Sequence, residues 1–229
     1  MSVLQEMRKR IAIYGGTFDP VHSGHLEIAR RVTELFAIDE FLFMPARVAP
    51  HKLDREVSGA LHRYAMLALA TRTEPRLSIS TFELDGPGRQ YTVDTLSHFR
   101  GQLGELTDLF FVMGADSWSE ITTWRDWRRL LTLANLIVVT RPGYEISAAQ
   151  MDAETAARIV DKRGANENPD TSETGTQKVF VTDAVMRDVS ATAIRRAANE
   201  DACKLNGLVP LEVAEYIRKY RLYRTTNEQ

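Results

Sequence analysis

A loop rich in glycine and histidine is the segment of this chain best suited to chemistry. Residues 15–25 read GGTFDPVHSGH and lie between a short apolar run, Ile11–Tyr14, and an amphipathic segment, His25–Phe36. Glycines let backbone amides approach a phosphate closely, and a helix start adds unpaired N–H groups and a positive dipole end. His22 and His25 are three residues apart, so both rings are expected on one face of that helix start. Each ring could donate a hydrogen bond to a phosphate oxygen and stabilise the charge that grows in a transition state.

Other motifs for phosphate or metal fit this loop less well. The sequence has no Gly-x-x-x-x-Gly-Lys-Ser/Thr P-loop and no Gly-x-Gly-x-x-Gly dinucleotide fingerprint. A zinc pair at His22 and His25 is conceivable, but no third ligand is evident nearby. The order of strand, glycines and helix therefore favours a phosphate site over a metal site.

The rest of the chain must form the scaffold that positions this loop, and its pattern predicts an α/β fold. Short runs rich in β-branched and aromatic residues are typical of buried strands. The expected strands are Ile11–Tyr14, Phe41–Met44, Leu77–Leu84, Leu109–Met113, Leu136–Thr140 and Val179–Thr182. The expected helices are His25–Phe36, Leu61–Thr71, Val93–Leu103, Trp124–Leu133 and Ala191–Ala198. This alternation predicts a doubly wound, mostly parallel, Rossmann-like sheet, which binds ligands beyond the carboxyl ends of its strands.

The organisation of the chain is predicted to be simple. A length of 229 residues favours one domain over 1–229. Residues 144–177 interrupt the alternation and are expected to be a surface insertion, with a short helix over Ser147–Asp161 and a polar loop over Arg163–Gln177. Residues 188–229 are expected to be a helical C-terminal part, closed by a helix over Pro210–Tyr220 that has proline in its first turn.

Composition and charge exclude several classes of protein. Acidic residues number 31 and basic residues 29, which argues against a protein that coats nucleic acid or an anionic membrane. No stretch approaches the roughly 20 apolar residues that span a bilayer, and the first ten residues do not read as a signal peptide. Cys203 is the only cysteine, so an internal disulfide is excluded and a reducing cytoplasm is the expected location.

The glycine and histidine residues also carry a resemblance to a known family. His22-Ser23-Gly24-His25 is similar to the His-x-Gly-His signature of the nucleotidyltransferase superfamily. The longer string GGTFDPVHSGHL resembles the opening of bacterial nicotinate mononucleotide adenylyltransferases. Further counterparts of that family's motifs follow in the same order: Pro50-His51-Lys52, Arg63 with Met66-Leu67, Tyr91–Leu96, Gly114-Ala115-Asp116 followed by Trp124, Arg141-Pro142-Gly143, and Ser190–Arg195. Several motifs in order are far more specific than any one of them.

This resemblance implies an enzyme of NAD biosynthesis. It would transfer AMP from ATP to nicotinate mononucleotide, giving deamido-NAD (nicotinate adenine dinucleotide) and pyrophosphate. Adenylyl transfer depends on positioning and electrostatic stabilisation. The implied cofactor is Mg²⁺, held mostly by phosphate oxygens and water, so no protein ligand is assigned to it. The expected partners are these small molecules rather than nucleic acid or membrane, and a homo-oligomer is left open.

The resemblance and the chemistry of the residues together give three sets of candidates. The catalytic candidates are His22, His25, Lys52 and Arg195. The candidates for binding ATP are Gly15, Gly16, Thr17, Phe18, His22, His25, Gly114, Asp116, Ser190, Thr192 and Arg195. The candidates for binding nicotinate mononucleotide are Gly16, Thr17, Lys52, Tyr91, Thr92, Trp124 and Arg141.

Plainer structural roles compete for several of these residues. Asp116, Thr92 and Ser190 each precede or begin an expected helix, so each could simply cap it. Trp124 and Trp127 have helical spacing, which favours neighbouring positions in the core. The resemblance instead implies that Trp124 stacks on the pyridine ring, a cationic ring that suits an indole face.

The sequence departs from the family pattern at a few positions. Ala191 stands where a second serine is common, Asp85 where a basic residue is common, and Gln90 where a serine is common; Arg89 is expected to compensate. These departures bear on the choice between acid and amide substrates. The alternatives are therefore the same transfer to nicotinamide mononucleotide or to both, transfer to another phosphorylated acceptor, and a nucleotide-sensing module without catalysis.

Overall fold

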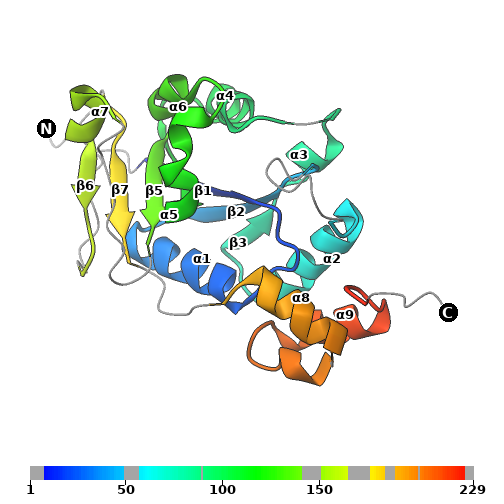
Figure 1. Ribbon diagram of the computed structural model, residues 1–229. Coiled ribbons are helices and arrows are strands. Elements are labelled where there is room, and N and C mark those ends of the chain that lie inside the picture. The colour runs from blue at the N-terminus through cyan, green and yellow to red at the C-terminus, as the bar shows by residue number, and fades with distance from the viewer. Residues whose placement is uncertain are drawn as a thin grey trace, which may run out of the picture.

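The molecule is built on one parallel sheet, as the sequence pattern predicts. The computed structural model describes residues 8–48, 57–88, 90–140, 151–164, 176–183, 189–200 and 202–224. Within these residues seven strands all pair in parallel, in the order β3-β2-β1-β4-β5-β7-β6 (Figure 1). The strands are β1 (Lys9–Gly16), β2 (Glu40–Pro45), β3 (Leu77–Ile79), β4 (Thr107–Gly114), β5 (Asn135–Val139), β6 (Ile159–Asp161) and β7 (Val179–Thr182).

Helices connect these strands and continue beyond the last one. They are α1 (Ser23–Leu35), α2 (Ala60–Thr71), α3 (Phe82–Asp85), α4 (Thr92–Leu103), α5 (Ala115–Ser119), η1 (Ile121–Thr123), α6 (Trp127–Leu133), α7 (Ala153–Ala157), α8 (Ala191–Glu200), η2 (Ala202–Leu205) and α9 (Leu211–Lys219). The α8, η2 and α9 segments form a helical group beside α1 and α2 (Figure 1). Pro210 caps α9 rather than opening its first turn.

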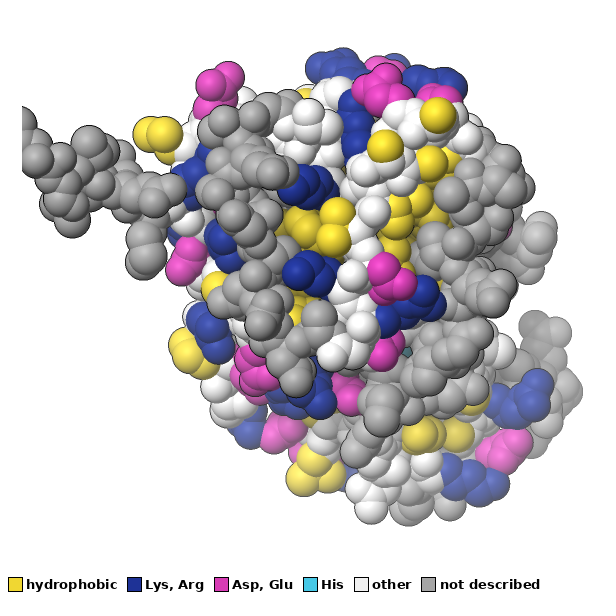
Figure 2. All heavy atoms as spheres, turned by 90° about the vertical axis from the view of Figure 1, so that its left-hand side faces the viewer, with side chains coloured by type: hydrophobic (Ala, Val, Ile, Leu, Met, Phe, Trp, Pro, Cys, Tyr) yellow, Lys and Arg dark blue, Asp and Glu magenta, His cyan; other side chains and the backbone are white. Residues whose placement is uncertain are grey.

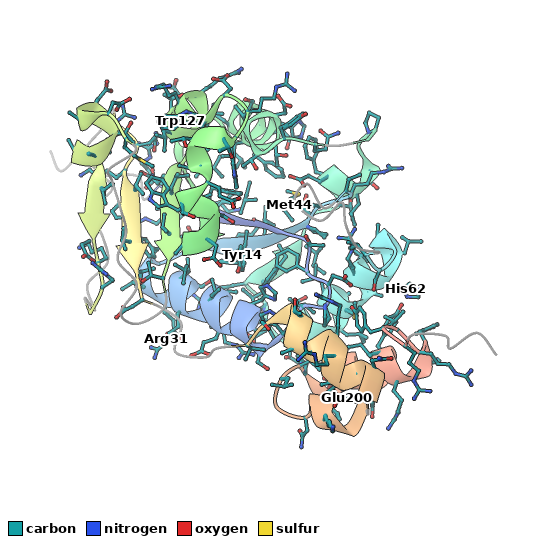
Figure 3. All side chains as sticks on the ribbon, in the orientation of Figure 1. Tyr14, Arg31, Met44, His62, Trp127 and Glu200 are labelled. Carbon is teal, nitrogen blue, oxygen red and sulfur yellow. The ribbon has the colours of Figure 1, made fainter. Side chains whose placement is uncertain are left out.

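Two apolar cores cover the two faces of the sheet. Alternate strand residues such as Tyr14 face α1, α2, α8 and α9, whereas their neighbours such as Ile13 face α4, α5 and α6. Tyr14 and Trp127 accordingly lie on opposite faces in Figure 3. Because both faces are covered, β4 and β5 are buried almost continuously, which explains why their sequences are apolar runs rather than alternating patterns.

The expected strand over Leu77–Leu84 is wrong beyond its first residues. The strand ends at Ile79, and Phe82–Asp85 form the short helix α3. Phe82 stacks on the His98 ring at a centroid distance of 4.2 Å. Packing of Phe82 against α4 therefore decides the local structure there, over the β-propensity of the run.

The expected helix over Ser147–Asp161 is also wrong at its end. Residues 147–150 lie outside the described residues, and the helix α7 covers only Ala153–Ala157. The side chain of Asp152 accepts a hydrogen bond from the Thr155 amide at 2.8 Å and so fixes where α7 begins. The following residues pair with β7 as the edge strand β6. Most of the polar loop 163–177 lies outside the described residues.

The edge formed by β6 and α7 carries charges of both signs. Lys or Arg and Asp or Glu side chains are interspersed on the face shown in Figure 2. Three ion pairs near this edge join Arg128 to Asp152, Arg158 to Glu154 and Arg163 to Asp161. Among the described helices, none has the length and apolar character needed to cross a bilayer.

Candidate active site

The glycine–histidine loop, residues 15–25, lies at the point where the strand order reverses. β1 pairs with β2 on one side and with β4 on the other, so the chain leaves the sheet in two directions there. Gly16 ends β1 and Gly114 ends the adjacent β4. The sheet therefore brings the glycine–histidine loop and the Gly114-Ala115-Asp116 motif to the same edge, at the carboxyl ends of adjacent strands, which is the usual ligand position of an open parallel sheet.

The two histidines of this loop stack on each other at the start of α1. Helix α1 begins at Ser23, two residues earlier than expected, with His22 in the N-cap position. The ring centroids of His22 and His25 are 3.6 Å apart with an interplanar angle of 25°, and the His22 amide donates to His25 Nδ1 at 3.3 Å. The prediction that both rings share one face is confirmed.

Glycine at position 24 permits this stacking. A Cβ at Gly24 would lie 3.2 Å from Nδ1 of His22, closer than most real Cβ contacts. The His-x-Gly-His order thus has a steric reason, because the ring of the first histidine lies over the glycine.

Burial keeps His22 neutral. His22 is only 7% exposed, and this desolvation lowers the pKa of its ring from 6.5 to about 4. Two imidazolium rings in this stack would also repel each other. At neutral pH His22 is therefore a neutral hydrogen-bond donor, held in place before any substrate arrives.

Phe18 supports the histidines from below rather than facing a ligand. The residue is 3% exposed, and its ring meets those of His25 and Phe43 edge-on at 5.0 and 5.4 Å. A Cβ at Gly16 would lie 2.9 Å from the Phe18 ring, so only glycine fits there. Because the ring is buried, Phe18 is expected to contact ATP only through its backbone. Gly15 lies beside it at the end of β1, and the half-buried Thr17 follows.

A buried arginine holds the loop to its neighbours, a role that sequence analysis did not assign. Arg63 is 1% exposed, and its guanidinium donates to the carbonyl oxygens of Ser58, Thr17 and Arg47 at 3.0, 2.8 and 3.3 Å. Burial lowers the pKa of Arg63, and the nearby negative charge of Asp19 opposes that shift. The sequence did offer one signal for this role: Arg63 stands among apolar residues of an expected helix. A charge buried there must have hydrogen-bond partners.

The start of α8 lies against the same loop. Arg195 donates to the carbonyl oxygen of Asp19 at 2.7 Å and to Thr192 Oγ1 at 2.8 Å. Ser190 Oγ accepts from the Ala193 amide at 3.1 Å, so its expected capping role is confirmed. The structure thus brings Arg195, Thr192 and Ser190 to the histidines, while their contacts with ATP stay predictions.

The tryptophan pair differs from the expected arrangement. Trp124 follows η1 in an extended conformation and is half-buried, whereas Trp127 begins α6 and is 9% exposed. The expectation that one helix carries both tryptophans is wrong. Asp126, which lies between them, has a left-handed backbone (φ 49°) and is the N-cap of α6, so the helix begins only after it. Trp127 is the core residue, and Trp124 meets the Phe111 ring edge-on at 6.4 Å.

The start of α4 lies close to this tryptophan. Tyr91 is the N-cap and Thr92 the first helical residue, so the expected capping role of Thr92 is wrong by one position. The Arg125 guanidinium lies 4.7 Å from the centre of the Tyr91 ring and 3.7 Å from the Asp94 carboxylate. Arg125 therefore links the segment of Trp124 to the helix start at Thr92.

Asp116 does not cap a helix. Gly114 occupies the N-cap position of α5, and Asp116 lies in the first turn with an exposed side chain. The residue is exposed at the carboxyl end of β4, and its contact with a ribose or adenine remains a prediction.

Two further side chains fix the segment that precedes α4. Glu83 of α3 accepts a hydrogen bond from Thr95 Oγ1 at 2.8 Å, and burial raises the pKa of Glu83. Arg47 donates to the carbonyl oxygens of Leu84 and Gly86 at 3.0 and 2.8 Å. Sequence analysis found neither, because both contacts join segments that are distant along the chain. Lys52, Arg141 and Arg89 lie outside the described residues.

Comparisons with known proteins agree with this geometry. A sequence model of the family described as cytidylyltransferase-like matches residues 13–197. A curated relative from Thermoanaerobacter sp., named "Probable nicotinate-nucleotide adenylyltransferase", is 39% identical over 97% of this chain and 98% of its own length. The chain belongs to the nicotinate-nucleotide adenylyltransferase family. A member of this family from Chromobacterium violaceum is 36% identical over 95% of this chain and 100% of its own length.

Solved structures share the fold. The nicotinic acid mononucleotide adenylyltransferase of Plasmodium falciparum complexed with NaAD superimposes with a TM-score of 0.70 at 18% identity, covering 94% of this chain and 97% of that one. The same protein complexed with APC gives a TM-score of 0.69 at the same identity and coverage. The nicotinate-nucleotide adenylyltransferase family thus keeps this arrangement of sheet and helices at low sequence identity.

Proposed function

We propose that this chain transfers the adenylyl group of ATP to nicotinate mononucleotide, giving nicotinate adenine dinucleotide and pyrophosphate in NAD biosynthesis. The observation that carries the proposal is the stacked histidine pair at the start of α1, in which His22 is neutral, with Arg195 of α8 bonded to the same loop. The names of relatives that match nearly the whole chain support it.

The chemistry is an in-line displacement at the α-phosphorus of ATP. A phosphate oxygen of the mononucleotide forms the new P–O bond. The bond to the β-phosphate breaks, and its electron pair leaves with pyrophosphate. The protein needs no covalent step, so its work is positioning and stabilisation of charge on the equatorial oxygens. In this proposal His22 and His25 donate to the transferring phosphate, and Arg195 with Lys52 neutralises the leaving pyrophosphate.

Magnesium enters this proposal as part of the substrate MgATP. Among the described residues no group of three or more His, Cys, Asp or Glu side chains could hold a metal ion. In this proposal phosphate oxygens and water hold the ion, which suits a cation that dehydrates reluctantly. It would neutralise charge on the leaving phosphates.

The start of α4 supports a preference for the acid over the amide. A carboxylate placed there faces unpaired amides and a positive helix end, whereas an amide gains less. Charge-assisted hydrogen bonds are about twice as strong as neutral ones, so a preference on the order of tenfold to a thousandfold is expected. Asp85 is exposed at the end of α3 and would lower this preference if its charge reached the carboxylate.

The direct test is pyrophosphate release with ATP and each mononucleotide, with the dinucleotide product separated by chromatography. The expected result is rapid release with nicotinate mononucleotide and slower release with nicotinamide mononucleotide. Equal kcat/KM for both would refute the selectivity while leaving adenylyl transfer in place. Nucleotide binding without any release would instead identify a sensing module.

The variants Trp124→Ala and Asp85→Asn separate stacking from charge. Both substrates present the same ring, so loss of Trp124 should reduce both rates and leave their ratio almost unchanged. Asp85→Asn keeps the shape and removes one negative charge, so it should raise the ratio in favour of the acid. A cytoplasmic location remains a prediction, and the oligomeric state is left open.

A further inference from the structure

A tyrosine that follows α9 reaches the glycine–histidine loop. The hydroxyl of Tyr223 donates to Asp19 Oδ1 at 2.8 Å, across 204 residues of sequence. Asp19 is 2% exposed, so this carboxylate cannot rely on water for its hydrogen bonds. Tyr223 itself is half-buried against the core beneath α1, α2 and α9.

Asp19 is held through both its side chain and its backbone. Its carboxylate receives the Tyr223 hydroxyl, and its carbonyl oxygen receives the Arg195 guanidinium at 2.7 Å. Two residues before it, the carbonyl of Thr17 receives Arg63 at 2.8 Å. Asp19 precedes His22 by three residues, so its position fixes where the histidine stack lies relative to Arg195.

We propose that Tyr223 is a positioning residue for adenylyl transfer, acting through its hydrogen bond to Asp19 to hold the histidine stack and Arg195 at one phosphate site. This inference rests on the proposed function. It differs from a purely structural role, because the bond ends on the loop that carries the reacting groups and not on the helical core alone.

The physical basis is the steep dependence of rate on geometry. A displacement of about 1 Å at a reacting group can cost on the order of a hundredfold in rate. Without the hydroxyl of Tyr223 the buried Asp19 carboxylate loses a hydrogen-bond donor, and the short loop between Asp19 and His22 is expected to shift. The effect should therefore appear in turnover by enzyme that remains folded.

The test compares Tyr223→Phe with the matched control Tyr216→Phe. Tyr216 lies on α9, is half-buried, and its hydroxyl lies 2.9 Å from His62 Nδ1 of α2, so the control removes a similar bond that does not touch the loop. With both substrates saturating, well below the melting temperature of either variant, Tyr223→Phe should lower kcat by about tenfold to a hundredfold. Its KM for nicotinate mononucleotide should change less than its kcat, because Thr92 and Trp124, which are proposed to hold the carboxylate and the ring, lie on other segments of the chain. Tyr216→Phe should keep the wild-type kcat.

Equal kcat for the two variants, or a loss in Tyr223→Phe confined to melting temperature, would overturn the proposal. A double-mutant cycle adds a second criterion. In an Asp19→Ala background the acceptor of this hydrogen bond is gone, so removing the Tyr223 hydroxyl should cost several-fold less in kcat than it does in the wild type. Independent, multiplicative losses would show that Tyr223 does not act through Asp19. If the wild type itself makes no dinucleotide, the proposed function fails instead.

Discussion

At each end of the sheet one arginine donates hydrogen bonds to several backbone carbonyls, but the segments that it joins differ in function. At the carboxyl end Arg63 donates to three backbone carbonyls of the loops around the histidines. At the amino end Arg100 donates to the carbonyls of Leu133, Gly104 and Thr107 at 2.8 to 3.1 Å. Both guanidiniums fasten chain segments together, but only the first set of segments carries groups suited to chemistry.

The surroundings of the two arginines show the difference. Near Arg100, Arg8 and Arg10 lie 2.9 and 3.8 Å from the largely buried Asp108, so the Asp108 carboxylate is already paired with cations of the protein itself. Near Arg63 the buried His22 ring is neutral and stacks on the His25 ring, so no charge is compensated there. We therefore expect the hydrogen bonds of Arg100 to contribute to stability, and those of Arg63 to hold the site in place before substrates bind.

The largest effect on activity is expected when one histidine at the carboxyl end of the sheet is removed. His25→Ala should lower kcat by about 10²–10³-fold, because one preorganised donor to the developing charge is lost. The fold should remain, since the ring is only partly buried. Steady-state kinetics and circular dichroism check this, with His62→Ala of α2 as the control histidine. Near wild-type turnover by soluble His25→Ala would refute the catalytic assignment.

The two arginines themselves give the next largest difference. Arg63→Ala should lower the free energy of unfolding by about 3 kcal/mol or more and kcat by about tenfold to a hundredfold, because buried partners lose their donor and the loop shifts. Arg100→Ala should lower stability as well but leave kcat unchanged. Urea unfolding with kinetics on both variants decides between them. A comparable kcat loss in Arg100→Ala would show that the two ends are not functionally distinct.

The cations at the carboxyl end should act on one substrate. Arg195→Ala and Lys52→Ala should each raise KM for ATP by about tenfold and change KM for the mononucleotide much less, since each removes a charge assigned to the leaving pyrophosphate. Titrations of each substrate at saturating levels of the other measure this. If the mononucleotide KM alone rises, these side chains serve the other substrate.

The smallest expected effect is a pH dependence of stability that originates at the carboxyl end. The pKa of His22 is about 4 in the folded protein, against 6.5 for an ordinary histidine. Below pH 6.5 the unfolded chain binds a proton that the folded protein refuses, so stability falls as the pH drops from 6.5 towards 4. The slope from this group is at most about 1.4 kcal/mol per pH unit.

Unfolding free energies of wild type and His22→Gln at pH 5 and pH 7 test this slope. The variant should show a smaller loss on acidification than the wild type. Glu83, whose pKa is raised by burial, contributes in the opposite direction in both proteins and cancels from the difference. Identical losses in the two proteins would mean that His22 is not held neutral by its surroundings.

Much of this architecture follows from sequence pattern, and the failures have a common cause. The parallel sheet and the shared face of His22 and His25 follow from periodicity and spacing, which are local properties. The expectations for Leu77–Leu84 and for the tryptophan pair fail where a contact or a left-handed residue overrides that periodicity. The contacts of Arg63 with Thr17 and of Asp19 with Tyr223 could not be predicted, because they join residues 46 and 204 positions apart.

The contacts of the glycine–histidine loop determine the order in which parts of the chain can fold during synthesis. Ser23 Oγ, the Asp19 carbonyl and the Asp19 carboxylate bind partners that lie 185, 176 and 204 residues further along the chain. During synthesis from the N-terminus, β1 to β7 can therefore emerge and pair while this loop still lacks those partners. Contacts of such long sequence separation form late in folding. A growing chain can thus complete its sheet first, and it gains the contacts that hold the glycine–histidine loop only after α8 and the segment beyond α9 have docked.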